Sequence, residues 1–242
     1  MKLKQYIGRH RTNLVTYGVV ILGFVIMQVL SASHMLSSSV EGFLVPICAY
    51  VVLAVSLNLV VGISGELSLG HAGFMGVGAF TGIIVAALLK TVIASKVLLL
   101  IVAIVCGGVM AGLFGVVIGL PVMRLRGDYL AIVTLAFGEI LKNLINNMYV
   151  GSDANGVHFV IGTEKPLLAD GGSMIINGPM GATGVAKLAT FPIGFALILV
   201  TLFVVLNLIN SREGRAIKAV RDNRIAAESV GINVTKYKLM AF

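Results

Sequence analysis

The residue types most able to do chemistry in this chain lie in a polar interruption between two apolar runs. Residues 62–71 read GISGELSLGH and contain Glu66, Ser68, Gly70 and His71. Inside a bilayer an ionisable group is costly without a partner or a task, and a glycine-rich break frees backbone groups that lipid cannot satisfy. Two interpretations stay open. The segment is either a broken helix at a translocation pathway, or a cytoplasmic hairpin with Glu66 and His71 in solvent.

A second candidate is Glu139, in the segment GDYLAIVTLAFGE at residues 127–139. Asp128 suits the first turn of a helix, because its charge meets the positive end of the helix dipole. Glu139 follows eleven residues later, about 16 Å along the axis and hence near mid-bilayer. Lys142 and Asn143 share its helical face. We weigh a structural ion pair against direct contact with a substrate.

The remaining residues offer no catalytic or metal-binding pattern. We find no paired carboxylates across the apolar runs, no metal-spaced His/Cys cluster and no nucleophile with a base. Cys48 and Cys106 both fall in apolar segments. No GxxxxGK[ST] motif occurs, so the chain is not expected to bind ATP in that manner. We therefore predict a non-catalytic protein that itself binds no cofactor.

The elements that position these residues follow from composition. Hydrophobic residues make up 58% of the chain and charged residues 12%, with a mean hydropathy of +1.02. This is typical of polytopic helical membrane proteins. We predict an all-α transmembrane helical bundle with about six complete spans plus the start of another. The apolar runs lie at residues 14–30, 43–61, 72–89, 97–120, 129–147 and 191–209.

Charge predicts the topology. The net charge of +8 comes mostly from residues in the gaps between apolar runs, which favours cytoplasmic loops over nucleic-acid binding. A cytoplasmic N-terminus places Arg124, Arg126 and the basic segment 212–238 on the same side. Lys90 and Lys96 are exceptions to this rule, because the same topology places them on the other side of the membrane. We favour retention of the first apolar run as a span over its cleavage as a signal peptide.

These assignments divide the chain into six parts. We expect a cytoplasmic basic N-terminus (1–13), transmembrane helices 1–5 with the glycine-rich break at 62–71 (14–149), an extracytoplasmic excursion (150–190), transmembrane helix 6 (191–209), a cytoplasmic segment (210–233) and the start of a further span (234–242).

The cytoplasmic segment has a helical pattern. Ala216, Ala219 and Val220 fall on one face of a predicted amphipathic helix, and a second short helix at 225–230 stops at Gly231. The face carries alanine and lacks large apolar residues, which favours a protein partner over anionic lipid.

Three ordered motifs carry a family resemblance. SLNLVVGISGELSLGHAGFMGVGAF (56–80), LPVMRLRGDYLAIVTLAFGEILKNLINN (120–147) and SREGRAIKAVRDNRIAAESVGINVTKYKLMAF (211–242) resemble the membrane subunits of branched-chain amino-acid ABC importers, of the LivM type. The resemblance implies uptake of leucine, isoleucine or valine across the inner membrane. It implies two cytoplasmic ABC ATPases that use ATP, a second permease subunit and an extracytoplasmic solute-binding protein. It also implies further spans after Phe242, so we expect a fragment or a shortened form.

The family's ATPase-coupling motif matches in part. Ala226, Ala227 and Gly231 match its Ala-Ala and Gly, whereas Ile225 stands in place of its leading Glu. The predicted coupling residues are Gly214, Arg215, Ala216, Ala219, Arg221, Ala226, Ala227 and Gly231. The predicted pathway residues are Asn58, Glu66, Ser68, Gly70, His71 and Glu139. Alternative functions are an importer permease for a sugar, a nucleoside or urea, and an ATP-independent channel or carrier.

Overall fold

The protein is described by a computed structural model, and the residues that it describes include six helices long and apolar enough to cross a membrane. The predicted class, a polytopic helical membrane protein, is confirmed. The model describes residues 2–33, 35–90, 92–123, 125, 128–153, 156–162, 165–166, 168, 172–183, 185 and 187–242. For residues 2–13 and for Asp128 the description is of the backbone. Arg124 and Arg126, used above for topology, lie outside the described residues.

The chain divides into two compact units, which we describe separately. The first comprises Met1–Asn58 and Ala189–Arg215, and the second Leu59–Leu188 and Ala216–Phe242. The first unit holds helices α1 (Lys2–Ala32), α2 (Ser38–Asn58) and α6 (Phe191–Asn210). Its buried core is formed by Cys48 of α2 and by Ile198 and Leu202 of α6.

The second unit is organised around α3 (His71–Leu89), which packs against both α4 (Lys96–Val122) and α5 (Asp128–Asn146). Glycine makes both contacts close. A methyl group on Gly107 of α4 would overlap the carbonyl oxygen of Gly78 in α3, and one on Gly73 of α3 would lie 3.4 Å from Gly138 Cα in α5. Small residues allow helix backbones to approach in this way, and van der Waals packing then holds the helices together.

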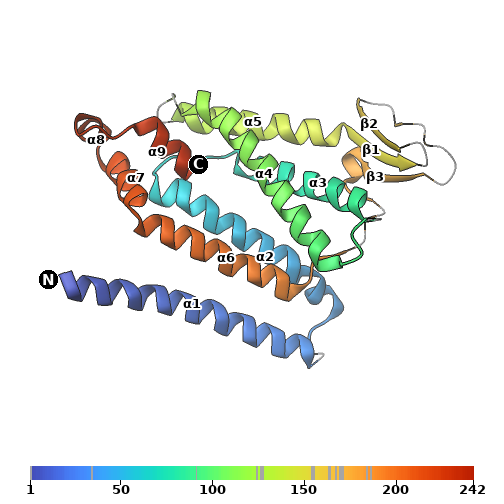
Figure 1. The fold of residues 1–242 in the computed structure, drawn as a ribbon, viewed down its shortest axis with the longest axis horizontal. Helices are drawn as coiled ribbons and strands as arrows, with labels where there is room; N and C mark the ends of the chain where they lie inside the picture. The colour runs from blue at the N-terminus through green and yellow to red at the C-terminus, as the bar shows by residue number, and fades with distance from the viewer. Residues whose placement is uncertain are drawn as a thin grey trace. The chain divides into compact units, whose positions relative to one another are not determined.

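A small sheet follows α5 and lies at the C-terminal end of α3 (Figure 1). Strands β1 (Met148–Asp153), β2 (Gly156–Ile161) and β3 (Ser173–Asn177) pair antiparallel in the order β2-β1-β3. The buried residues of β1 and β3 pack against apolar residues of α3. The sequence analysis predicts an all-α bundle and an excursion with some structure of its own, and it does not predict these strands. Their short apolar stretches lie between glycine, asparagine and aspartate, which weakens the alternating pattern.

The opposite end of the second unit holds residues 216–242, which include the last two helices (Figure 1). Helix α7 (Arg212–Asp222) spans the boundary between the units, followed by α8 (Arg224–Ser229) and α9 (Val234–Ala241). The side chains of Asn223 and Asn233 cap α8 and α9, each accepting a backbone hydrogen bond of 3.0 Å. Gly231 lies between them with φ +83°, a conformation that favours glycine. The sequence pattern predicts a short helix at residues 225–230, and the observed helix α8 begins and ends one residue earlier.

Candidate functional site

The break between the second and third spans begins as a change of helix type. Helix α2 ends at Asn58, a π-helical turn η1 (Leu59–Ile63) follows, and α3 begins only at His71. The freed backbone is satisfied internally, because the Ser64 amide donates to Leu59 at 3.0 Å and the Glu66 amide donates to Val60 at 3.2 Å. The protein therefore supplies the hydrogen bonds that lipid cannot.

Helix α7 rests directly on this break. The guanidinium of Arg221 donates a 3.1 Å hydrogen bond to the carbonyl of Gly62. Gly65 adopts φ +73°, and a methyl group there would lie 2.7 Å from Cγ of Arg221. Glycine is thus required at position 65 by its backbone angle and by the arginine stem packed on it.

Helix α9 contacts the same break through an ion pair. The ammonium of Lys238 contacts the carboxylate of Glu66, and their side chains are only 9% and 15% exposed. The hypothesis that Glu66 is solvated is therefore wrong. Glu66 interacts with a lysine 172 positions further along the chain. The sequence contained one usable signal, since Lys238 directly precedes the apolar residues 239–242, and a lysine in apolar surroundings needs a partner.

The far end of the break is held by α5. The amide of Leu69 donates a 3.1 Å hydrogen bond to the hydroxyl of Thr134, which donates in turn to the carbonyl of Ala131 at 2.9 Å. A methyl group on Gly70 would overlap the backbone carbonyl of Thr134. Thr134 is 2% exposed, and sequence reasoning missed it because its hydroxyl lies within an apolar run.

Thr134→Val is expected to destabilise the protein by about 1–2 kcal/mol, because the Leu69 amide then lacks its acceptor. Thr201→Val is the matched control, since the Thr201 hydroxyl donates only to Leu197 within its own helix. Thermal unfolding of the purified protein measures both. Equal shifts in the two variants would contradict a special role for Thr134.

Two other predicted pathway residues lie beside this contact. Ser68 is 4% exposed, and its hydroxyl has no hydrogen-bond partner among the described residues. The ring of His71 meets Phe74 edge-on, with centroids 6.3 Å apart, and Phe74 in turn meets Phe242 at 5.4 Å. The first turn of α3 thereby packs against the C-terminal end of α9.

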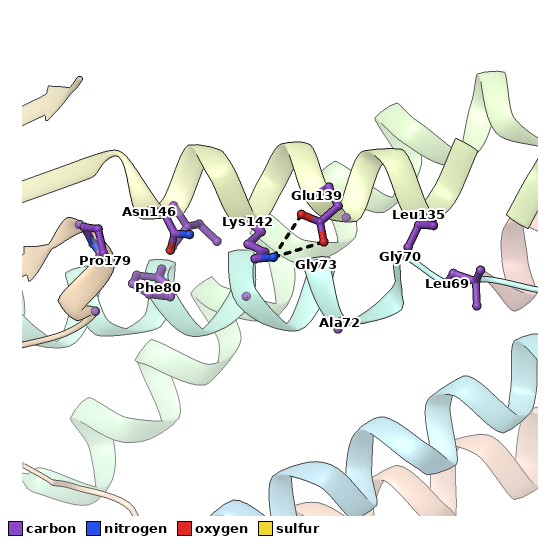
Figure 2. Close-up of a pocket in the computed structure, with 15 residues that line it drawn as sticks. Leu69, Gly70, Ala72, Gly73, Phe80, Leu135, Glu139, Lys142, Asn146 and Pro179 are labelled. Carbon is purple, nitrogen blue, oxygen red and sulfur yellow. Dashed lines mark hydrogen bonds and ion pairs between the residues drawn. The ribbon is translucent and has the colours of Figure 1, made fainter. Parts of the chain in front are cut away.

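A cavity of about 470 Å³ opens beside the break, between α3 and α5. Glu139 and Lys142 lie along it, with their charged ends 3.2 Å apart (Figure 2). The predicted ion pair is therefore present, although its side chains are 56% and 63% exposed. The other lining residues are Leu69, Gly70, Ala72, Gly73, Gly76, Phe80, Leu135, Gly138, Ile145, Asn146, Gly178, Pro179 and Gly181.

The predicted coupling residues divide into buried and exposed sets. Gly214 lies against the carbonyls of Leu208 and Ile209, and Ala227 is 3% exposed. The buried residues of α7 are Gly214, Ile217 and Val220, whereas Ala216 and Ala219 are half-buried, so the predicted apolar face was shifted. Arg215, Arg221, Ala226 and Gly231 are exposed.

The structure also reveals two exposed apolar residues that sequence reasoning did not select. Ile225 is 79% exposed and Val230 is 74% exposed, at either end of α8. Both side chains are therefore available for contact with a partner protein. Among the described residues, no group of three or more His, Cys, Asp or Glu side chains is arranged to hold a metal ion.

The six apolar helices define a multi-pass membrane protein, and comparison with known proteins gives its family. Residues 39–242 match the model of the branched-chain amino acid transport system permease component, and the chain belongs to this family. It is 36% identical over 206 residues to the high-affinity branched-chain amino acid transport system permease protein LivM of Escherichia coli (strain K12). The corresponding protein of Salmonella typhimurium is 35% identical over the same length.

The alignment with each of these two relatives covers 80% of this chain and 46% of the relative. The chain therefore spans about half the length of the curated relatives that it matches. No solved structure matches significantly.

Proposed function

We propose that this chain is a membrane-spanning permease subunit of an ATP-driven importer that carries branched-chain amino acids across the inner membrane. The observation that carries the proposal is the family match at residues 39–242, which includes the break and the helices packed on it. The chain itself is non-catalytic and binds no cofactor, and the partner subunits use ATP.

The proposed partners follow from the two ends of the second unit. Two cytoplasmic ABC ATPases drive the importer, and one of them docks on α7 and α8 of this chain, where the exposed residues Ile225 and Val230 offer apolar contact. An extracytoplasmic solute-binding protein delivers the substrate on the side of the sheet. A second permease subunit and membrane lipid cover the spanning helices, and nucleic acid is not a partner. The N-terminus is cytoplasmic, as the basic segments favour.

The proposed mechanism is mechanical. ATP-driven closure of the ATPases displaces α7 and α8 as one body, and α9, which packs against α8, moves with them. Two contacts carry this displacement into the break, the hydrogen bond from Arg221 to Gly62 and the ion pair between Lys238 and Glu66. The break lies where α3 begins, at one end of the cavity between α3 and α5. Displacement there switches the bundle between outward and inward access.

Five of the six predicted pathway residues have one of two roles in this mechanism: they line the cavity or they position the break. Gly70 and Glu139 line the cavity, so they belong to its wall. Glu66 and Ser68 are largely buried, and His71 is packed on Phe74, so they position the break. Asn58 is the last residue of α2 before the π-helical turn.

Capture of the ATPase tests the docking surface. Ile225→Asp and Val230→Asp are expected to lower its recovery in a pull-down by tenfold or more, because each places a charge in an apolar contact. Both positions are exposed, so the fold should be kept. Gly214 and Ala227 are poorer choices, since substitution there disturbs buried packing.

Val157→Asp is the matched control, because Val157 is an exposed apolar residue of strand β2, 46% exposed. It should retain the ATPase. Recovery of the ATPase by all three variants, or by none including the unmodified chain, would overturn the proposed docking.

A further inference from the structure

The cavity between α3 and α5 is an elongated groove that follows the helices. It begins at Leu69 and Gly70 in the break and reaches the turn at residues 178–181 (Figure 2). On α3 its lining extends to Phe80, ten residues beyond Gly70, which is roughly 15 Å at the standard rise per residue. This is about half the thickness of a hydrocarbon core.

Small residues make up much of the groove's wall, and they let α3 and α5 pack closely beside it. Ala72, Gly73 and Gly76 line it from α3, and Gly138 lines it from α5. A methyl group on Gly73 would lie 3.0 Å from Leu141, and one on Gly76 would lie 3.2 Å from Ile145. Its volume of about 470 Å³ falls within the range of sites that bind small molecules.

The wall of the groove carries one negative and one positive side chain. Among its described lining residues, Glu139 and Lys142 alone carry a charge. Both side chains are more than half exposed, in the second half of a helix that is apolar enough to span a membrane. Contact with lipid is costly for charges at this depth, so this face is turned toward water or protein.

We propose that the groove binds a free amino acid as its zwitterion, with the ammonium group at Glu139 and the carboxylate at Lys142. The apolar side chain of the substrate lies against the apolar lining, which includes Phe80, Leu135 and Ile145. This inference rests on the proposed function and identifies the residues that contact the substrate at one position along the translocation pathway.

Charge balance supports a zwitterion over other solutes. In the structure the Lys142 ammonium donates to both carboxylate oxygens of Glu139, at 3.3 and 3.2 Å. A zwitterion replaces this internal pair by two new charge-assisted contacts and adds no net charge to the groove. A simple cation or anion would leave one protein charge unpaired, and a sugar or urea would match neither charge.

The test measures binding to the purified full chain in lipid nanodiscs. Tritiated leucine is the probe, and two analogues compete with it: leucinamide, which lacks the carboxylate, and 4-methylpentanoate, which lacks the ammonium group. On the unmodified chain, leucine is expected to bind about tenfold or more tightly than either analogue. Lys96→Met is the matched control, because Lys96 is an exposed lysine at the start of α4, outside the groove.

The variants assign each contact separately. Lys142→Met should lower leucine affinity about tenfold, whereas leucinamide affinity should not fall and should rise, because leucinamide has no carboxylate contact to lose and no longer leaves Lys142 unpaired. Glu139→Gln should likewise lower leucine affinity about tenfold, whereas 4-methylpentanoate affinity should not fall and should rise, because this analogue has no ammonium contact to lose and no longer leaves Glu139 unpaired. This crossed pattern would not arise from misfolding. Absence of leucine binding to the unmodified chain, or equal leucine affinity in both variants and the control, would overturn the inference. ATPase capture decides the proposed function independently.

Discussion

Gly70→Val is expected to destabilise the protein by about 3 kcal/mol or more, at the upper end of overpacking effects. Even a methyl group at this position would overlap the backbone carbonyl of Thr134, and Gly138 lies beside it. A flexible side chain can rotate away from such a contact, but a backbone carbonyl within α5 cannot. The helices must therefore separate, and the hydrogen bond from Leu69 to Thr134 is lost with them.

Gly108→Val is the matched control for this prediction. Gly108 also lies within a spanning helix, but a side chain there meets nothing within 4 Å. For a domain of this size, each kcal/mol shifts Tm by about 2–4 °C, so Gly70→Val should lower Tm by roughly 6–12 °C. Thermal unfolding followed by size-exclusion chromatography measures both variants. A control that loses as much stability as Gly70→Val would refute the backbone contact as the cause.

Lys238→Met is expected to cost about 3–5 kcal/mol, because it leaves the largely buried carboxylate of Glu66 without its partner. The double variant Glu66→Gln/Lys238→Met should recover most of this loss, since it removes both charges. The pair joins α9 to the break, so Lys238→Met should also reduce ATP-driven transport in the assembled importer. Thermal unfolding of the two single variants and the double variant forms a double-mutant cycle.

The exposed pair between Arg224 and Glu228 provides the control. Its side chains are 35% and 48% exposed, and its N–O distance is 3.0 Å. Because water screens such a pair, Glu228→Gln should cost no more than about 1 kcal/mol. Strictly additive losses in the cycle at Glu66 and Lys238 would show that the two side chains do not interact.

The elements that the sequence predicts well are the ones with long apolar runs. Six apolar runs predicted six spans. A helix that crosses a bilayer requires about twenty apolar residues in a row, and few other structures contain runs of this length. The Glu139 and Lys142 pair was also predictable, since residues three apart share a helical face. The short strands were not predicted, because five or six residues give too weak a periodic pattern.

The buried face of α7 shows a second limit of prediction from the sequence. Alanine at positions 216 and 219 suggested one face, yet Ile217 is 1% exposed and Ala216 is only half-buried. On a helix these choices differ by one residue, or about 100° of rotation. Local pattern cannot choose between neighbouring faces when alanine and isoleucine both qualify, so the packed neighbours decide.

By itself, then, the sequence determined the class of this protein, its spans and the existence of a polar break, because hydrophobic length and composition act locally along the chain. Only the tertiary structure decided what the break contacts. Glu66 interacts with Lys238, Gly62 accepts from Arg221, and Gly70 lies on Thr134. The partners are separated by 64 to 172 positions, and such contacts depend on how the helices pack, which no local pattern encodes.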